Sequence, residues 1–172
     1  DDFEITEGGR PQKIDTFKLV SVDNGLLAAR ETPPPPIRTD DDEAREAARD
    51  DVRVFAVFLD DYHVKRDSSI RMNEQIARFV ETQLGPADMI GIMYPLESID
   101  GVRLSRDHDT IRRAILQFAG RKYDYTPKTD AESKYVYRVQ ARQIEQIRNE
   151  VSFSAIKSLI AHLGTLKDGR KS

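Results

Sequence analysis

The stretch from Val52 to Leu59 constrains the fold of this chain more than any other part of its sequence. It is almost entirely apolar, Val-Arg-Val-Phe-Ala-Val-Phe-Leu, and rich in β-branched and aromatic residues. A short continuous apolar run is typical of a strand buried on both faces, as in a parallel sheet covered by helices. The run ends abruptly at Asp60-Asp61, so we predict a central strand that delivers two carboxylates to its carboxyl end.

The elements after this strand alternate between helix and strand. Ser69 is predicted to be the N-cap of a helix that stops at Gly85-Pro86, and residues 89–94 form a second apolar run. An Asp-Gly turn at residues 100–101 predicts that residues 102–104 return antiparallel as an edge strand. This order predicts a doubly wound α/β domain over residues 52–172.

Two further helical regions follow. Asp107 or Asp109 is predicted to cap a helix that ends at Gly120, with Ile111, Ile115, Leu116 and Ala119 directed inward. Residues 136–163 keep three-to-four spacing, and we predict two helices there, with a break near residues 152–154. Lys171-Ser172 is expected to enter another strand, so the domain is expected to be incomplete at its C-terminus, with a sheet edge open to self-association.

The first 51 residues are predicted to form two other parts. Residues 1–30 alternate apolar and polar positions around Gly8-Gly9, which indicates a β-hairpin. Two strands alone are marginal in water, so we interpret this part as the end of an upstream β-domain, with a hairpin packed on the main domain as the alternative. Residues 31–51, with four consecutive prolines and an acidic run able to cap a short helix, are predicted to be a linker.

The balance of charged residues limits the kinds of partner. Lysine and arginine number 27 and aspartate and glutamate 30, which gives a net charge of −3. This balance disfavours binding to nucleic acid or to an anionic membrane surface. No apolar run reaches the roughly 18 residues of a membrane span. The chain has no cysteine, which excludes disulfides and thiol chemistry.

The carboxyl end of the first strand is the candidate site. Ligands of doubly wound sheets bind beyond the carboxyl ends of the strands. Successive side chains on a strand point to opposite faces, so we expect Asp60, rather than Asp61, to face the crevice. A carboxylate beside helix N-termini rich in hydroxyl groups suits a hard cation such as Mg²⁺, Ca²⁺ or Mn²⁺.

Several segments resemble a known family. Val54–Asp60, the helix after it, Met89–Tyr94 and the Asp100-Gly101 turn look like a von Willebrand factor A domain. Asp2–Ile14 (Asp-Phe-Glu-Ile-Thr-Glu-Gly-Gly-Arg-Pro-Gln-Lys-Ile) and Phe58–His63 are more closely similar to the VWFA-related proteins of Acidobacteria and similar bacteria. The resemblance covers nearly the whole chain. It implies a Rossmann-like von Willebrand A-type sheet with one antiparallel edge strand, and a location outside the cytoplasm.

The resemblance also implies a metal site. The family's metal-ion-dependent adhesion site uses Asp-x-Ser-x-Ser after the first strand, a threonine in a later loop and an aspartate after a later strand. Asp60 matches the first aspartate, whereas Tyr62 and Val64 stand where the serines belong. Thr126, with Thr129 as second choice, lies in the loop of the threonine. The implied ligands of Mg²⁺ or Ca²⁺ are Asp60, Thr126 and two substitute serines, Ser68 and Ser69.

Other residues near this rim are candidates for binding a partner. Asp61 and His63 flank the site, and a lone histidine in a polar loop is either a metal ligand or simply exposed or hydrogen-bonded. Tyr123 and Tyr125 lie among basic residues in the loop of residues 121–138. Aromatic and arginine side chains dominate interaction hot spots, although tyrosines that cover a helix edge give the same pattern.

We therefore expect a non-enzymatic, adhesion-type module that binds a protein or extracellular ligand over this rim, through a divalent cation completed by a ligand carboxylate. Two alternatives stay open. One is a metal-free scaffold that uses the 121–138 loop. The other is a metal-dependent hydrolase at Asp60-Asp61, although Tyr62 stands where such enzymes need a second acid.

Overall fold

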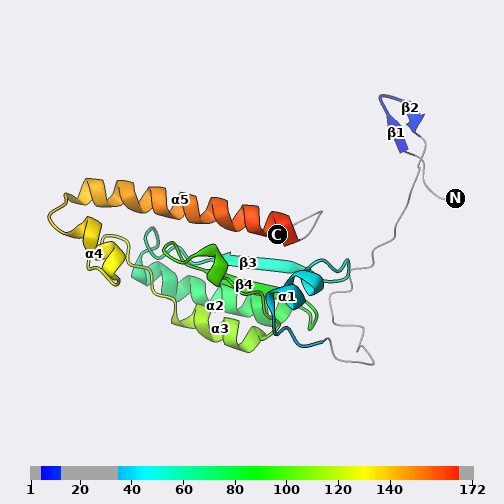
Figure 1. Cartoon of the computed structure of the whole chain (residues 1–172), viewed down its shortest axis with the longest axis horizontal. Helices are drawn as coiled ribbons and strands as arrows, with labels where there is room; N and C mark the ends of the chain where they lie inside the picture. The colour runs from blue at the N-terminus through cyan, green and yellow to red at the C-terminus, as the bar shows by residue number, and fades with distance from the viewer. Residues whose placement is uncertain (1–4, 13–34, 167–172) are drawn as a thin grey trace.

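The computed structural model describes residues 5–12 and 35–166. In the second range, strands β3 (Val54–Phe58) and β4 (Met89–Met93) pair in parallel, with Val54 opposite Met89 and Phe58 opposite Met93. Helix α2 (Arg66–Gln83) connects them, as parallel strands require a crossover. The architecture is mixed α/β, with a small sheet that has helices on both faces (Figure 1).

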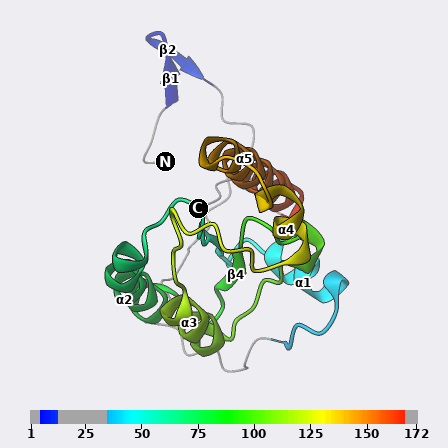
Figure 2. The ribbon, with the colours of Figure 1, turned by 90° about the vertical axis from the view of Figure 1, so that its left-hand side faces the viewer.

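The two faces of this sheet pack against different helices. On one face, Ala77 and Val80 of α2 and Ile115 of α3 (His108–Gln117) surround Ile90. On the other face, α5 (Ala141–Leu166) places Ala155 and Leu159 against Met93, while α2 and α3 lie together across the sheet from it (Figure 2). Alternate side chains of β4 therefore pack on opposite faces of the sheet, Ile90 on one face and Met89 and Met93, in two separate apolar clusters, on the other.

The predicted central strand, β3, pairs only with β4 within the described residues. Its residues 55–58 are half-buried, whereas four of the five residues of β4 are buried. On the far side of β4 the chain returns antiparallel, as predicted, but this return is one isolated bridge between Ile90 and Ser105. The expected Asp-Gly turn is a 3₁₀ turn, η1 (Ile99–Gly101).

The acidic run of residues 40–43 begins a packed helix, α1 (Asp40–Ala47). Thr39 caps it through a capping box, because its hydroxyl accepts the Asp42 N–H and the Asp42 carboxylate accepts the Thr39 N–H. Ala47 is fully buried in a cluster with Val52 and Met89. The part of the predicted linker from Asp40 onward is therefore attached to the core.

The break in the C-terminal helical region is not where the sequence predicted it. Helix α5 runs without interruption through Ser152–Ser154, so the predicted break there is wrong. The break lies at residues 137–140, between α4 (Asp130–Val136) and α5, where Arg138 takes a positive φ of 61°. The predicted helix end at Gly120 is close, since α3 ends at Gln117, but Leu116 and Ala119 are exposed rather than inward.

The N-terminal hairpin consists of β1 (Ile5–Glu7) and β2 (Arg10–Gln12). Gly8 and Gly9 both have positive φ values, of 57° and 77°, as a two-residue hairpin turn requires. The rest of the predicted hairpin, Ile14–Val22, and the strand expected at Lys171-Ser172 lie outside the described residues. None of the described helices combines the length and the hydropathy needed to cross a bilayer.

Candidate functional site

Asp60 lies immediately beyond β3, in the loop predicted to carry the site. The register of the sheet continues to this point, because the Leu59 N–H donates to the carbonyl of Met93 at 2.9 Å. Asp60 Oδ1 accepts hydrogen bonds from the backbone N–H groups of Tyr62 and His63, at 3.2 and 3.3 Å. Its side chain is 22% exposed. The loop thus folds back over its own carboxylate.

The remaining partners of Asp60 connect it to α5. Ser152 Oγ donates to Asp60 Oδ1 at 3.3 Å, and Oδ2 lies 2.7 Å from His63 Nδ1. The other ring nitrogen of His63 lies 2.6 Å from Asn149 Oδ1. Asp60 is therefore packed against a helix, and Ser152 and Asn149 are partners that sequence reasoning missed.

The other predicted metal ligands do not join Asp60. The buried hydroxyl of Ser69 donates to the Arg66 carbonyl at 2.6 Å and accepts the Gly120 N–H at 3.0 Å. Ser69 is not the N-cap of α2, which begins at Arg66 after Lys65. Ser68 is half-buried, Thr126 is exposed, and no hydrogen bond within the described residues links either of them to Asp60.

The donors around Asp60 do not fit the implied cation. Two backbone N–H groups, a hydroxyl and an imidazole already occupy the carboxylate, and N–H groups cannot coordinate a metal. Across residues 5–12 and 35–166, no group of three or more metal-ligating side chains comes together. The geometry of Asp60 is that of a loop anchor.

Asp61 belongs to a buried network rather than to an open rim. Its Oδ2 pairs with Arg121 Nε at 2.6 Å, and its carbonyl accepts the Arg121 N–H at 2.7 Å. Arg121 also pairs with Glu132, which accepts the Tyr62 hydroxyl at 2.9 Å and the Lys128 N–H at 2.6 Å. Tyr62 and Glu132 are fully buried. This network fixes the 121–138 loop on the loop that follows β3.

The protonation of this network follows from its contacts. Burial raises the pKa of Tyr62, and its hydrogen bonds with Tyr135 and Glu132 raise it further. Burial alone would raise the pKa of Glu132, but hydrogen bonds from Arg121, the Lys128 N–H and Tyr62 lower it below its usual value. Burial would lower the pKa of Arg121, yet its bonds to Glu132 and Asp61 raise it. The carboxylate and the guanidinium therefore stay charged at neutral pH.

Arg148 of α5 is a second buried cation at this end of the sheet. Its guanidinium lies 4.7 Å from the ring centroid of Tyr62 and 5.0 Å from that of Tyr125. It donates to the Asp124 carbonyl at 2.7 Å, while its Nε and Nη1 find no hydrogen-bond partner among the described residues. Arg148 thereby fixes the loop to α5. The sequence does contain one indication that Arg148 is buried: it lies on the apolar stripe of α5, four residues after Ile144.

The outer surface of the same loop carries exposed tyrosines beside basic groups. Tyr123 is 62% and Tyr137 is 72% exposed. The Lys122 ammonium lies 5.3 Å from the ring of Tyr123, and the Arg138 guanidinium 5.1 Å from the ring of Tyr137. Tyr125 is half-buried, and its hydrogen bond with Glu145 raises its pKa. We name six residues of this loop, all exposed except the half-buried Lys122, the tyrosine–basic surface: Lys122, Tyr123, Lys128, Lys134, Tyr137 and Arg138.

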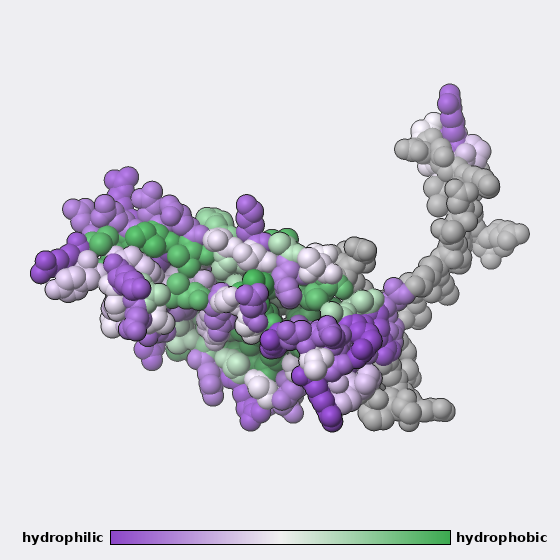
Figure 3. All heavy atoms as spheres, in the orientation of Figure 1, coloured by the Kyte–Doolittle hydropathy of each residue, from purple (hydrophilic) through white to green (hydrophobic). Residues whose placement is uncertain are grey.

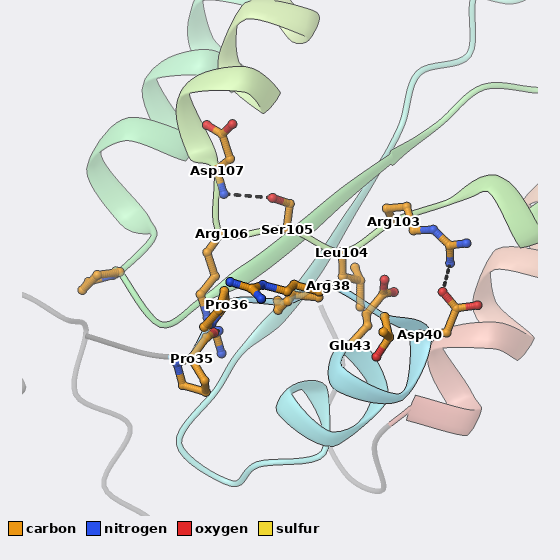
Figure 4. Close-up of a pocket in the computed structure, with 13 residues that line it drawn as sticks. Pro35, Pro36, Arg38, Asp40, Glu43, Arg103, Leu104, Ser105, Arg106 and Asp107 are labelled. Carbon is orange, nitrogen blue, oxygen red and sulfur yellow. Dashed lines mark hydrogen bonds and ion pairs between the residues drawn. The ribbon is translucent and has the colours of Figure 1, made fainter. Parts of the chain in front are cut away.

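A cavity of about 570 Å³ lies away from this surface, between the start of α1 and residues 103–107 (Figure 4). Three arginines line it, and two of them, Arg103 and Arg106, form ion pairs. Arg106 pairs with Glu46 at 2.6 Å and donates to the carbonyls of Pro35 and Ala87 at 3.0 and 3.2 Å. Arg103 pairs with Asp40 at 2.9 Å. These arginines connect segments of the fold, and the sequence did not predict the cavity.

The chain order of strand, helix, strand, antiparallel return and helix is the order predicted from the apolar runs and turns of the sequence, from which a doubly wound α/β domain was expected. The structure establishes the coarser part of that expectation, a mixed α/β architecture with a parallel pair of strands. The described sheet is smaller than a doubly wound sheet. Comparison of the chain with protein-family models, with curated proteins and with solved structures gives no match.

Proposed function

We propose that this chain is a non-enzymatic binding module that recognises an acidic protein segment through its tyrosine–basic surface, without a bound cation. The fold we propose for it is of the von Willebrand A type. The observation that carries the function is the pair of exposed tyrosines, Tyr123 and Tyr137, each beside a cation and held by a buried network. Aromatic and cationic side chains of this kind dominate interaction hot spots.

The surface lies where ligands of α/β sheets bind. The Arg121 N–H donates to the carbonyl of Asp61 at 2.7 Å, and the Lys122 N–H to that of Val64 at 3.0 Å. These bonds attach the loop to the segment that follows β3, at the carboxyl end of the parallel strands. Crevices at this end of open α/β sheets are the usual ligand sites of such folds.

The charges of this region favour an acidic partner. Over residues 121–142 the exposed or half-exposed basic side chains are Lys122, Lys128, Lys134, Arg138 and Arg142, against two exposed acids, Asp124 and Asp130. Arg121 is paired in the interior with Glu132 and Asp61, and Lys128 also lies 3.8 Å from Asp61, so with these groups counted the local charge is +6 − 4 = +2. The chain as a whole carries −3. A basic region on an acidic protein steers acidic partners to one face.

The buried network makes this surface rigid before it binds. Tyr123 takes a positive φ of 71° and Arg138 one of 61°, and the segment around Tyr123 is held by the bonds of Arg121 to Asp61 and of Arg148 to the Asp124 carbonyl. Because tyrosine has few rotatable bonds and its backbone is already ordered, binding costs little conformational entropy. The acidic and basic groups inside the network therefore act in recognition by positioning the loop.

Binding of defined peptides tests this proposal. A fluorescein-labelled glutamate-rich peptide should bind the protein in fluorescence anisotropy, and its affinity should fall as salt rises. The double variant Tyr123→Ala/Tyr137→Ala should lose at least about 1–2 kcal/mol of binding free energy. Phe153→Ala removes an aromatic residue of α5 that is equally exposed, at 72%, and should leave binding unchanged.

Two controls separate this function from a cation-bridged one. A lysine-rich peptide of equal length should not bind, and chelation with EDTA should leave the affinity for the acidic peptide unchanged. If binding required millimolar Mg²⁺ or Ca²⁺ and Asp60→Ala abolished it, the cation-bridged adhesion site would replace the metal-independent surface. Equal binding by the tyrosine double variant and the parent would contradict the proposal directly.

A further inference from the structure

The cavity between the start of α1 and residues 103–107 contains a buried carboxylate without a partner. Glu43 lines this cavity of about 570 Å³ and is only 5% exposed. Its side chain forms no hydrogen bond or ion pair within residues 5–12 and 35–166. Buried charges in proteins are normally paired, because moving an unpaired charge out of water is unfavourable. Glu43 is therefore placed to bind a cationic group that enters the cavity.

The position of Glu43 on α1 explains how this carboxylate is held. Asp40, Glu43 and Ala47 are three and four residues apart, so they share one side of the helix, and Ala47 is fully buried against the core. Hydrophilic residues cover the outer side of α1 (Figure 3). Glu43 also lies in the first turn, where the helix dipole favours negative charge. The helix thus stabilises the carboxylate without occupying its oxygens.

The remaining charged groups of the cavity leave one cation free. Six charged side chains line it, and four of them form ion pairs or cap α3: Asp40, Arg103, Arg106 and Asp107. The backbone N–H of Arg38 donates to Asp42 Oδ2 at 3.2 Å, which fixes the start of its side chain. Its guanidinium is exposed and has no partner among the described residues. Glu43 and Arg38, around the same cavity, thus offer one unpaired charge of each sign (Figure 4).

The uncharged part of the wall is mainly apolar. Leu104, which is 2% exposed, and four further residues form it: Pro35, Pro36, Ile37 and Pro86. Proline rings are rigid, so this wall loses little conformational entropy when a ligand packs on it. The volume lies within the range of cavities that hold small molecules, about 300–1,000 Å³. The cavity is therefore suited to a small ligand with an apolar body.

We propose that this cavity binds a small zwitterion with an apolar body, an amino acid or a short peptide. The ammonium group of the ligand pairs with Glu43, its carboxylate pairs with Arg38, and its side chain packs on the proline and leucine wall. A charge-assisted hydrogen bond at each end fixes the orientation of the ligand. Arg38 repels a dication and Glu43 repels a dianion, so the two residues together select a zwitterion.

Isothermal titration calorimetry with two probes tests this site. L-Leucine carries its ammonium and carboxylate on one carbon, whereas the two groups are roughly 7 Å apart in extended L-leucyl-L-leucine. The tighter probe therefore reports whether the site takes a free amino acid or a peptide. Its N-acetylated form, which lacks the ammonium, and its C-terminal amide, which lacks the carboxylate, should each bind at least tenfold more weakly. Absence of binding by both probes at millimolar concentration would overturn the proposal.

Two charge variants assign the two ends of the ligand. Glu43→Gln should weaken the tighter probe at least tenfold and leave the affinity for its N-acetylated form unchanged. Arg38→Gln should likewise weaken the probe but not its C-terminal amide. Asp41→Asn, at an exposed position in the same turn of α1, should bind as the parent does. Equal affinity of Glu43→Gln and the parent would contradict the assignment.

The stability of the unliganded variants tests whether the chain itself supplies the cation. Glu43→Gln and Asp41→Asn each remove one negative charge from the first turn of α1. Because the Glu43 carboxylate has no partner, Glu43→Gln should melt at or above the Tm of Asp41→Asn. A Tm at least about 5 °C lower would mean that Glu43 pairs with a cation of this chain outside the described residues, and would overturn the ligand site.

The zwitterion site is independent of the tyrosine–basic surface. The double variant Tyr123→Ala/Tyr137→Ala should bind the tighter probe with the affinity of the parent. Glu43→Gln should bind the acidic peptide as the parent does. The failure of either proposal is therefore distinguishable from the failure of the other.

Discussion

At Gly120, two loops approach so closely that there is no room for a side chain. A Cβ atom built there would lie 2.3 Å from the Val64 carbonyl oxygen and 2.7 Å from its carbon. The Gly120 N–H meanwhile donates to Ser69 Oγ. The absence of a side chain thus lets the segment after α3 lie directly on the segment after β3, and this contact places the tyrosine–basic surface.

Gly120→Ala should therefore destabilise the protein. The clash is with backbone atoms, so a loop must move, at a cost of about 1–3 kcal/mol in the free energy of unfolding. Gly101→Ala is the matched control, because a Cβ there meets nothing within 4 Å. Urea denaturation measures both variants. Equal stability of the two variants would show that the contact at Gly120 is not a constraint.

At the same scale, local roles were predictable and long-range partners were not. Asp107 was predicted to cap a helix, and its carboxylate does accept the Thr110 N–H at 3.0 Å. Asp60 was predicted to face an open crevice, but Ser152 and His63 occupy its oxygens. Ser152 is 92 residues away in the chain. A sequence pattern encodes the end of a strand, but not which distant helix will pack against it.

At the scale of elements, α5 shows why the position of a helix break could not be predicted. Its 26 residues exceed the usual length of a globular helix, and Ser152-Phe153-Ser154 is a weak helix-forming triplet, so a break was expected there. Instead Ser152 is buried and donates to Asp60, and Ala155 and Leu159 pack on the sheet. Tertiary contacts on one face of α5 outweigh the local propensity of these residues.

Gly164, in the last turns of α5, is where local propensity still decides stability. It is exposed, and a Cβ added there meets nothing within 4 Å. Gly164→Ala should raise the free energy of unfolding by about 0.5–1 kcal/mol, because alanine loses less backbone entropy than glycine in a helix. Guanidinium denaturation measures the change. No change in stability would mean that the end of α5 frays in solution, so that helix propensity does not contribute there.

At the scale of the whole molecule, buried ion pairs join segments that are far apart in sequence. Glu46 of α1 pairs with Arg106, 60 residues later, and Arg121 joins Asp61 to Glu132. The sequence showed a chain in which a third of the residues are charged, without showing which charges would be buried. The alternation of elements was predictable from apolar periodicity alone. The ion pairs depend on how the finished layers meet.

These pairs predict how stability depends on pH. Burial alone would raise the pKa values of Glu46 and Glu132. For Glu46, the neighbouring arginines outweigh the effect of burial. For Glu132, hydrogen bonds from Arg121, the Lys128 N–H and Tyr62 outweigh it, so the pKa values of both carboxyl groups are lowered. A carboxylate whose pKa is lowered in the folded state stabilises the protein fully at a pH above its pKa in the unfolded chain, about 4.3. This stabilisation is lost as the pH falls through the lower pKa of the folded state. The free energy of unfolding should therefore decrease steadily below about pH 5.

Substitution of one glutamate separates this effect from general acid sensitivity. Glu132→Gln leaves Arg121 buried with only one carboxylate, Asp61, and should cost about 3 kcal/mol at pH 7. The same variant no longer has the Glu132 proton to take up, so its stability should depend less steeply on pH between about 5 and 3 than that of the parent. Glu74→Gln, at an exposed position of α2, should keep the parent slope. If Glu132→Gln also kept that slope, Glu132 would titrate alike in the folded and unfolded chains, and the charged network that holds the 121–138 loop would not exist in solution.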